Sequence, residues 1–167
     1  YFFHAERLSI AESSFGHNTV LSPDARNLPE VLGILQSNMG RMNRFNQYVS
    51  EIFPTIQRVA VRPNSNNAWQ ISIWTIDPVT ERDDLAMGLT DCGTGVGQVL
   101  AILYVAVTSS PPFSRTIIID EPNSFLHPGA AKKLLEILRT FPHLQFIIST
   151  HSPEIIRAAN ANTLTLV

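Results

Sequence analysis

Three polar residues follow two apolar segments near the carboxyl end of the chain. Asp120 and Glu121 come directly after the segment 116–119, and His151 closely follows the segment 145–148. A carboxylate behind a buried strand can hold Mg²⁺ through water, and an adjacent Glu can orient and deprotonate an attacking water molecule. A His side chain can donate a hydrogen bond to a developing anionic oxygen. Together these residue types predict phosphoryl transfer to water.

The two apolar segments predict strands of a parallel sheet. Their unbroken β-branched and aromatic residues indicate strands that are covered on both faces, as in α/β proteins. A helix between them is predicted by an apolar stripe made of Ala131, Leu134, Leu135 and Leu138. Ser152 is a suitable cap for a further helix that begins at Pro153. Because ligands of open α/β sheets bind beyond the carboxyl ends of the strands, we expect Asp120, Glu121 and His151 to meet at one edge.

The front of the chain predicts helices and an antiparallel hairpin. Helices are expected over about 28–37, with Asn27 as the cap, and over about 42–53. Alternating apolar residues on both sides of the turn 63–67 predict a hairpin over about 59–75. A short strand is expected within 1–8, and a helix buried on most sides is expected over 97–107.

Composition excludes several classes of protein. The 167 residues are 44% hydrophobic and 16% charged, which is not the composition of a disordered chain. A net charge of −2 does not favour nonspecific electrostatic binding to nucleic acid. The lone Cys92 cannot close a disulfide within the chain, so we expect a cytoplasmic protein. The longest apolar stretch, 99–107, is far short of the ~20 residues of a membrane span, so no membrane partner is expected.

Four ordered motifs resemble those of the ABC-type ATPases. Residues 116–122 (TIIIDEP) resemble the Walker B strand, and residues 146–153 (FIISTHSP) resemble the switch-histidine segment. Residues 123–128 (NSFLHP) are similar to the D-loop of members that act in DNA metabolism and defence. Residues 89–98 (LTDCGTGVGQ) are similar to the signature loop. The front half resembles the overcoming-lysogenization-defect (OLD) type of AAA-family ATPase, within the branch that includes SMC and RecF-like proteins.

The resemblance implies a fold and a domain organisation. The expected fold is an α/β P-loop NTPase of the ABC type, a mainly parallel sheet flanked by helices, with a helical and β-hairpin segment at the front. Residues 1–87 would be the variable helical and hairpin segment, and residues 88–167 the core with the signature, Walker B, D-loop and switch His. The phosphate-binding pattern G-x-x-x-x-G-K-[ST] does not occur, and the only lysines are Lys132 and Lys133. The Walker A part of an ATPase is therefore absent from these residues, and we expect this chain alone to bind ATP poorly.

The resemblance also implies roles for individual residues, with ATP and Mg²⁺ as cofactors. Asp120 would hold the metal, Glu121 would polarise the hydrolytic water, and His151 would contact the γ-phosphate. The D-loop residues Ser124 and His127 would face a second ATPase subunit. The residues that would present backbone amides and a helix N-terminus to the partner's ATP are Gly95, Val96, Gly97 and Gln98. Many relatives carry Ser where Gly95 stands, so one hydroxyl contact is missing here.

The expected function is ATP hydrolysis at a head-to-tail dimer interface, coupled to a DNA-directed or anti-phage task. One alternative is a nucleotide-sensing dimerisation module without productive hydrolysis. Another is the ATPase part of an OLD-type nuclease, with a nuclease or effector domain or subunit as partner. DNA is a further candidate partner, because the middle segment carries four arginines that could meet phosphate: Arg41, Arg44, Arg58 and Arg62.

Overall fold

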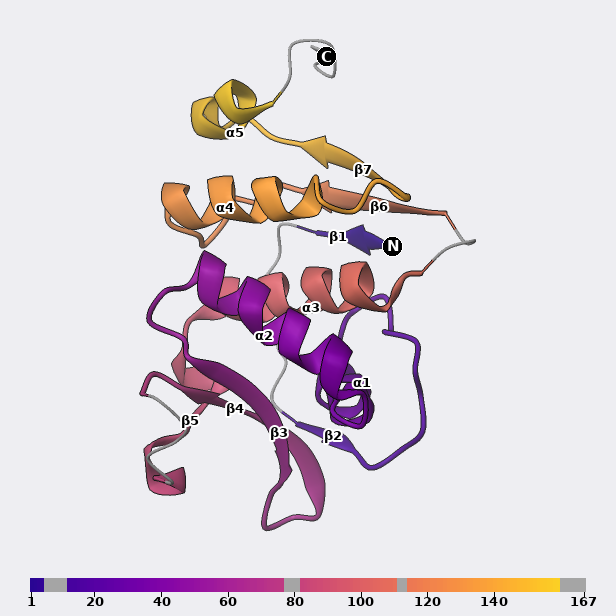
Figure 1. The fold of residues 1–167 in the computed structure, drawn as a ribbon, viewed down its shortest axis with the longest axis vertical. Coiled ribbons are helices and arrows are strands. Elements are labelled where there is room, and N and C mark those ends of the chain that lie inside the picture. Colours follow the sequence, from indigo (N-terminus) through magenta and orange to yellow (C-terminus); the bar gives the residue numbers. More distant parts are fainter. Residues whose placement is uncertain (5–11, 77–81, 111–113, 160–167) are drawn as a thin grey trace.

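Two sheets lie on either side of a long central helix in the computed structural model, which describes residues 1–4, 12–76, 82–110 and 114–159 (Figure 1). The central helix is α3, Thr94–Thr108. One sheet is parallel and is formed by β1 (Phe2–Phe3), β6 (Arg115–Asp120) and β7 (Leu144–Ser149), in the order β1-β6-β7. Part of the strand expected within 1–8 lies outside the described residues.

The parallel pairing of β6 with β7 confirms the prediction from the two apolar segments. Their register aligns Ile118 with Ile147 and Asp120 with Ser149. Ile117 and Ile119 are fully buried on one face, but Ile118 is only partly buried and Ile147 is 49% exposed, so the expected cover on both faces is wrong for these residues. The register brings the last residues of both strands to the same edge.

Two helices follow the strands of the parallel sheet. Helix α4 (Pro128–Leu138) buries the whole predicted apolar stripe, and α5 (Pro153–Ala158) begins at the expected proline. Ser152 occupies the cap position of α5, but the predicted cap hydrogen bond is wrong. Its hydroxyl donates to the Glu154 carboxylate at 2.9 Å, and its oxygen accepts no hydrogen bond from a first-turn amide of α5.

The predicted hairpin is confirmed and is part of a larger antiparallel sheet. Strands β3 (Arg58–Pro63) and β4 (Ala68–Trp74) form the hairpin, and β2 (Glu12–Ser14) and β5 (Met87–Gly88) pair with β4. Short 3₁₀ turns occupy Asp83–Leu85 and Leu89–Asp91. The two extra strands are too short to show an alternation in the sequence.

The helices of the front half differ from the prediction at their ends. Helix α1 is Leu28–Leu35, and α2 is Met39–Ile52, which begins before the expected residue 42. Asn38 sets this earlier start, because its side chain accepts a hydrogen bond from the Arg41 amide at 3.0 Å. Asn27 precedes α1 but does not cap it, since its side-chain oxygen accepts from the Ser22 amide at 2.7 Å.

Helix α3 begins at Thr94, three residues before the predicted start at 97. The Gly93 backbone, at φ +81°, ends the preceding turn in a conformation that glycine adopts without strain. From Val99 to Ala106 the helix is buried on every side, as predicted. One hydrophobic cluster joins it to both sheets, so residues before and after position 88 share a core. Within the described residues no helix has the length and apolar character needed to cross a bilayer.

Candidate functional site

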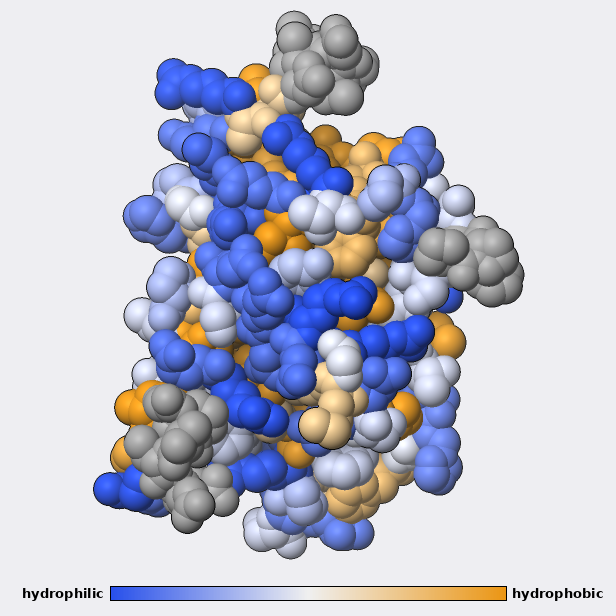
Figure 2. All heavy atoms as spheres, viewed as in Figure 1, coloured by the Kyte–Doolittle hydropathy of each residue, from blue (hydrophilic) through white to orange (hydrophobic). Residues whose placement is uncertain are grey.

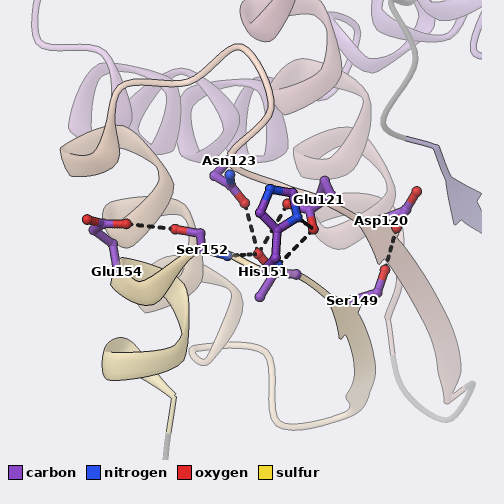
Figure 3. Close-up of polar contacts among 8 residues, drawn as sticks. Asp120, Glu121, Asn123, Ser149, His151, Ser152 and Glu154 are labelled. Atoms are coloured by element: carbon purple, nitrogen blue, oxygen red, sulfur yellow. Dashed lines mark hydrogen bonds and ion pairs between the residues drawn. The ribbon is translucent and has the colours of Figure 1, made fainter. Parts of the chain in front are cut away.

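The carboxyl ends of β6 and β7 bring the predicted Asp120, Glu121 and His151 to one edge of the parallel sheet (Figure 3). The Glu121 amide donates to the Ser149 carbonyl at 2.9 Å and so extends the ladder by one bond. Directly afterwards the chain turns, and Glu121 has a φ of +48°, an uncommon backbone conformation for a side chain of its size. The turn aims the Glu121 carboxylate at the segment that follows β7.

The Glu121 carboxylate is held by the residues that follow β7. Its Oε1 atom accepts from the His151 amide at 2.8 Å and lies 2.6 Å from the His151 ring atom Nδ1. The Glu121 side chain is 16% exposed, whereas the His151 ring is 89% exposed. A mostly buried carboxylate with fixed donors thus lies beside a solvent-facing imidazole. If Nδ1 carries the proton toward Glu121, then Nε2 is the ring nitrogen left for a ligand.

Thr150 links the two strand ends, although the sequence analysis did not name it as a site residue. Its hydroxyl lies 3.0 Å from Asn123 Oδ1 and 3.3 Å from Glu121 Oε2, so its single proton is shared between these acceptors. The same oxygen accepts from the Ser152 amide at 3.0 Å. Asn123 lies in the motif 123–128 and Thr150 in the motif 146–153. Their place in these motifs is the sequence feature that could have indicated a supporting role.

Asp120 has a different environment from Glu121. Its Oδ1 atom accepts from the Ser149 hydroxyl at 2.5 Å, and the Asp120 side chain remains partly exposed (Figure 3). A partly exposed carboxylate oxygen next to a hydroxyl is a donor set that suits Mg²⁺, which commonly takes one or two carboxylates together with water and substrate phosphate. The residues present therefore fit a metal that is completed by a ligand. Among the described residues no group of three His, Cys, Asp or Glu side chains gathers into a protein-only metal site.

Glu154, in the first turn of α5, and Cys92, just before α3, have shifted pKa values. Hydrogen bonds from its own amide and from the Ser152 hydroxyl lower the pKa of Glu154, which keeps a negative charge at the start of α5. Burial, followed by the charge of Asp91, raises the pKa of the Cys92 thiol. Cys92 also lies close to the Gly88 carbonyl, at 3.4 Å from its sulfur. Cys92 is therefore a partly buried thiol whose pKa is raised, next to the first turn of α3.

The loop from Glu121 to His127 places Ser124 and His127 near the site, outside the hydrogen bonds that hold the Glu121 carboxylate. The Ser124 amide donates to the Glu121 carbonyl at 2.9 Å. His127 is exposed and caps α4, because its Nδ1 atom accepts from the Gly129 amide at 3.2 Å. Between them Phe125 has a φ of +66° and is half exposed. The loop thus presents an aromatic ring and an imidazole at the surface.

The first turn of α3 packs directly against this loop. A Cβ atom added to Gly95 would lie 2.4 Å from the Phe125 carbonyl oxygen and 2.7 Å from a methyl group of Leu126. This close approach requires glycine at position 95. A groove of about 700 Å³ opens along the contact, and its walls include Gly93, Phe125, His127 and Lys133.

The four predicted signature residues lie together in the first turns of α3, and all four are buried within the described chain. In a helix that begins at Thr94, the amides of Gly95 and Val96 belong to the first turn and lack an acceptor in the helix. The Gln98 amide lies beyond that turn, and its side chain donates to the His4 carbonyl at 3.4 Å. Gly93, which precedes the four, is exposed.

The four arginines of the middle segment do not form one surface. Residues 59 and 61 of β3 pack into the core toward α1 and α2, so the alternation of the strand turns Arg58 and Arg62 to the opposite face. Arg62 donates to Ser72 and lies 4.7 Å from the centre of the Trp74 ring. Arg41 and Arg44 are exposed on α2. The four arginines therefore do not make one continuous basic surface, and DNA as a partner stays a prediction.

Comparison with known proteins gives the family. A family model described as "AAA domain, putative AbiEii toxin, Type IV TA system" matches residues 35–157. The chain belongs to this AAA-domain family. The matched range contains the first turns of α3, both strand ends and the loop between them. An ATPase domain of this type accounts for the carboxylates at the edge of its parallel sheet.

A relative of the AAA domain is "Retron Ec83 probable ATPase" from Escherichia coli, at 23% identity over 103 residues. The match covers 55% of this chain, and the chain spans only 19% of that relative's length.

Solved structures support the fold of the AAA domain. A structure from a study of "ATP-driven dimerization and DNA stimulated activation of SMC ATPases" superposes with a TM-score of 0.53 at 12% identity, covering 76% of each chain. The SMC head bound to the C-terminal winged-helix domain of ScpA has a TM-score of 0.55 at 10% identity, over 75% of this chain and 38% of that one. An SMC head from Pyrococcus furiosus has a TM-score of 0.52 at 13% identity, over 81% and 33%. The architecture is therefore that of a P-loop NTPase, as the sequence predicted.

Proposed function

We propose that this AAA domain binds ATP and hydrolyses it at an interface with a second ATPase subunit. The observation that carries the proposal is the Glu121 carboxylate, fixed at the end of β6 by donors from the end of β7. A carboxylate held in this way is suited to orient and deprotonate water, since its position is set before the substrate arrives. Asp120 beside it supplies a second, more exposed carboxylate.

His151 would contact the γ-phosphate from the exposed side of Glu121. Its amide and Nδ1 both lie against one Glu121 oxygen, so the ring is oriented while Nε2 stays available. With Nδ1 directed at Glu121, Nε2 is the ring atom that would face the phosphate. The pair would therefore place a carboxylate base for water beside a ring nitrogen for phosphate.

Asp120, with Ser149 at its side, would hold Mg²⁺ through water. When bound, Mg²⁺ would neutralise charge on the phosphates of ATP. The short Ser149 to Asp120 hydrogen bond fixes the carboxylate and leaves its second oxygen for this purpose.

The groove between α3 and the loop is the proposed meeting place with the second subunit. Phe125 and His127 provide exposed apolar and polar surface there, with Ser124 in the same loop. The free first-turn amides of Gly95 and Val96 would favour a phosphate at this end of α3. For Gly97 and Gln98 we propose a supporting role that keeps this turn in place, because both are buried and the Gln98 side chain is bonded to His4.

The phosphate-binding loop would come from outside residues 1–167, because the G-x-x-x-x-G-K-[ST] pattern does not occur in them. In the described part of the chain β7 pairs only with β6, so its other edge is open to a further parallel strand. We keep residues 1–87 as the variable segment and 88–167 as the catalytic core of one ATPase domain.

The coupled task that we propose is a defence or DNA-directed reaction. The matching family's description refers to a toxin–antitoxin system, and the bacterial relative is a retron ATPase. Both point toward defence, with an effector domain or subunit as partner.

Light scattering of the full-length protein tests the proposed interface. With Glu121→Gln, which keeps the shape of the side chain, ATP should convert monomer to dimer, and omission of ATP should reverse this. Phe125→Ser in the same background should weaken the dimer, whereas Phe15→Ser, at an exposed Phe that does not line the groove, should not. An oligomeric state that is the same with and without ATP would contradict the proposal.

A further inference from the structure

A second polar cavity lies at the opposite end of the parallel sheet from Asp120 and Glu121. Its volume is about 390 Å³, and its walls come from α2, α3 and the start of β6. Arg41 enters it from the first turn of α2, and Arg115 enters it as the first residue of β6. Two guanidinium groups that are far apart in the sequence therefore face one space.

Neither guanidinium is neutralised by a carboxylate in the part of the chain that the structure describes. Arg41 donates to the Ser110 hydroxyl at 3.3 Å, and Arg115 lies 5.9 Å from the centre of the Tyr1 ring. No wall residue is acidic. Figure 2 shows that the surface over α2, where Arg41 and Arg44 stand, is strongly hydrophilic.

The other polar side chains of the cavity do not provide a negatively charged acceptor for the two arginines. The buried Tyr104 hydroxyl donates to the Thr19 carbonyl at 2.7 Å, and Thr108 donates to the Tyr104 carbonyl at 2.7 Å. Asn38 uses its side-chain oxygen for the Arg41 amide, so its NH₂ group is left as a donor. The arginine and Asn38 donors therefore face no anionic acceptor.

Both arginine charges act on the same buried group, the Tyr104 hydroxyl. Burial, followed by the charge of Tyr1, raises the pKa of Tyr104 to about 12, and the charges of Arg115 and Arg41 oppose that rise. Glu30 also acts on Tyr104, but its carboxylate is buried elsewhere and is held by the Asn18 amide at 2.9 Å. The two arginines are therefore the positive charges that act on Tyr104 from the cavity walls.

We propose that the Arg41 and Arg115 cavity binds a phosphate group, either as free phosphate or as part of a nucleic-acid backbone. Planar guanidinium groups bind phosphate oxygens in pairs, and two of them from different elements can grip one phosphate from two sides. The site is separate from the proposed ATP site, so it stands whether or not that proposal holds.

Two binding measurements on the full-length protein test this proposal and separate the two sources. Titration calorimetry with sodium phosphate at constant ionic strength measures free phosphate, and fluorescence anisotropy with a labelled duplex measures DNA. The double variant Arg41→Gln and Arg115→Gln should lose about tenfold or more in at least one of the two assays. If DNA is the ligand, the magnitude of the slope of log affinity against log salt should also fall by about 0.9, because one phosphate contact is lost.

The matched control is the double variant Arg44→Gln and Arg58→Gln, which removes the same charge from exposed positions outside the cavity. We expect it to change either affinity less than threefold, and thermal unfolding should show that both variants are folded. Equal losses in the two variants would overturn the proposal. Binding of phosphate and DNA that is unchanged by the first variant, or absent from the wild type, would overturn it as well.

Discussion

The Nδ1 atom of His151 lies 2.6 Å from Oε1 of Glu121, and the His151 amide donates to the same oxygen at 2.8 Å. Residues that are 30 apart in the sequence thus act as one unit at the end of two parallel strands. The amide contact belongs to the backbone, so it remains when the imidazole is removed. This separates the two proposed roles of His151, which would position Glu121 through its amide and meet a ligand through its ring.

Replacing the ring should therefore affect catalysis more than structure. We expect His151→Ala to lower the ATP turnover number by about 10²-fold, in the range found when one preorganised donor to a transition state is removed. The free energy of unfolding should change by less than about 0.5 kcal/mol, because the ring is 89% exposed. Steady-state kinetics and denaturant unfolding check both values. His17→Ala, at another exposed histidine, is the control and should leave turnover unchanged.

Thr150 should act as a positioning residue for Glu121. Thr150→Val keeps the shape of the side chain but removes the donor to Asn123 and Glu121 and the acceptor for the Ser152 amide. We expect a loss of about 1–3 kcal/mol in stability and a lower kcat with little change in KM.

Thr140→Val is the matched control for that experiment. It removes a hydroxyl that donates to the Ile137 carbonyl at 2.7 Å at the end of α4, away from the strand ends. Thr140→Val should lower the free energy of unfolding by as much as Thr150→Val or by less. Its kcat should be that of the wild type. Equal kcat values for the two variants would show that Thr150 is only structural.

The parallel sheet and its edge could be predicted from sequence because both depend on short-range patterns. Unbroken β-branched runs identify β6 and β7, and polar residues directly behind them must lie at the carboxyl edge. The helix starts were less accurate. Asn27 and Ser152 have the side chains of helix caps, but each makes a competing contact, with Ser22 and Glu154 respectively. Such competition depends on neighbours that a propensity rule does not include.

The supporting residues of the site could not be predicted for a similar reason. Thr150 matters because the register of β7 on β6 brings it to Glu121, and register follows from three-dimensional pairing. The contact of Gly95 with the Phe125 carbonyl depends on a left-handed backbone at Phe125. The cavity between Arg41 and Arg115 joins two elements whose separation in sequence gives no sign of contact.

Gly95 should not accept a side chain unless the loop beside it moves. Gly95→Ala puts a methyl group 2.4 Å from the Phe125 carbonyl oxygen, so the loop must move away from the helix. We expect a loss of about 1–3 kcal/mol in the free energy of unfolding, as for other overpacked sites. Gly40→Ala is the control, because that helical position has no neighbour nearer than 3.7 Å. It should be neutral or stabilising by up to about 1 kcal/mol. Equal effects in the two variants would disprove the close packing.

Tyr104 should make stability depend on pH in the alkaline range. Its pKa is raised by burial to about 12 in the folded protein, above the value of about 10 of an exposed tyrosine. The folded state therefore holds the proton more tightly, so this contribution is complete below pH 10 and is lost as the pH rises through 12. Denaturant unfolding from pH 9 to 12 should show a fall that is smaller by about 2–3 kcal/mol in Tyr104→Phe. Identical slopes for both proteins would contradict the role of Tyr104.

The most direct test of the proposed function is ATP hydrolysis by the full-length protein with Glu121→Gln. Gln keeps an oxygen that can accept from the His151 amide, but it cannot take a proton from water. We expect turnover to fall by about 10²–10⁴-fold while ATP binding, measured with a fluorescent analogue, changes less than about threefold. Turnover close to that of the wild type would show that Glu121 does not activate water, and the proposed mechanism would then be wrong.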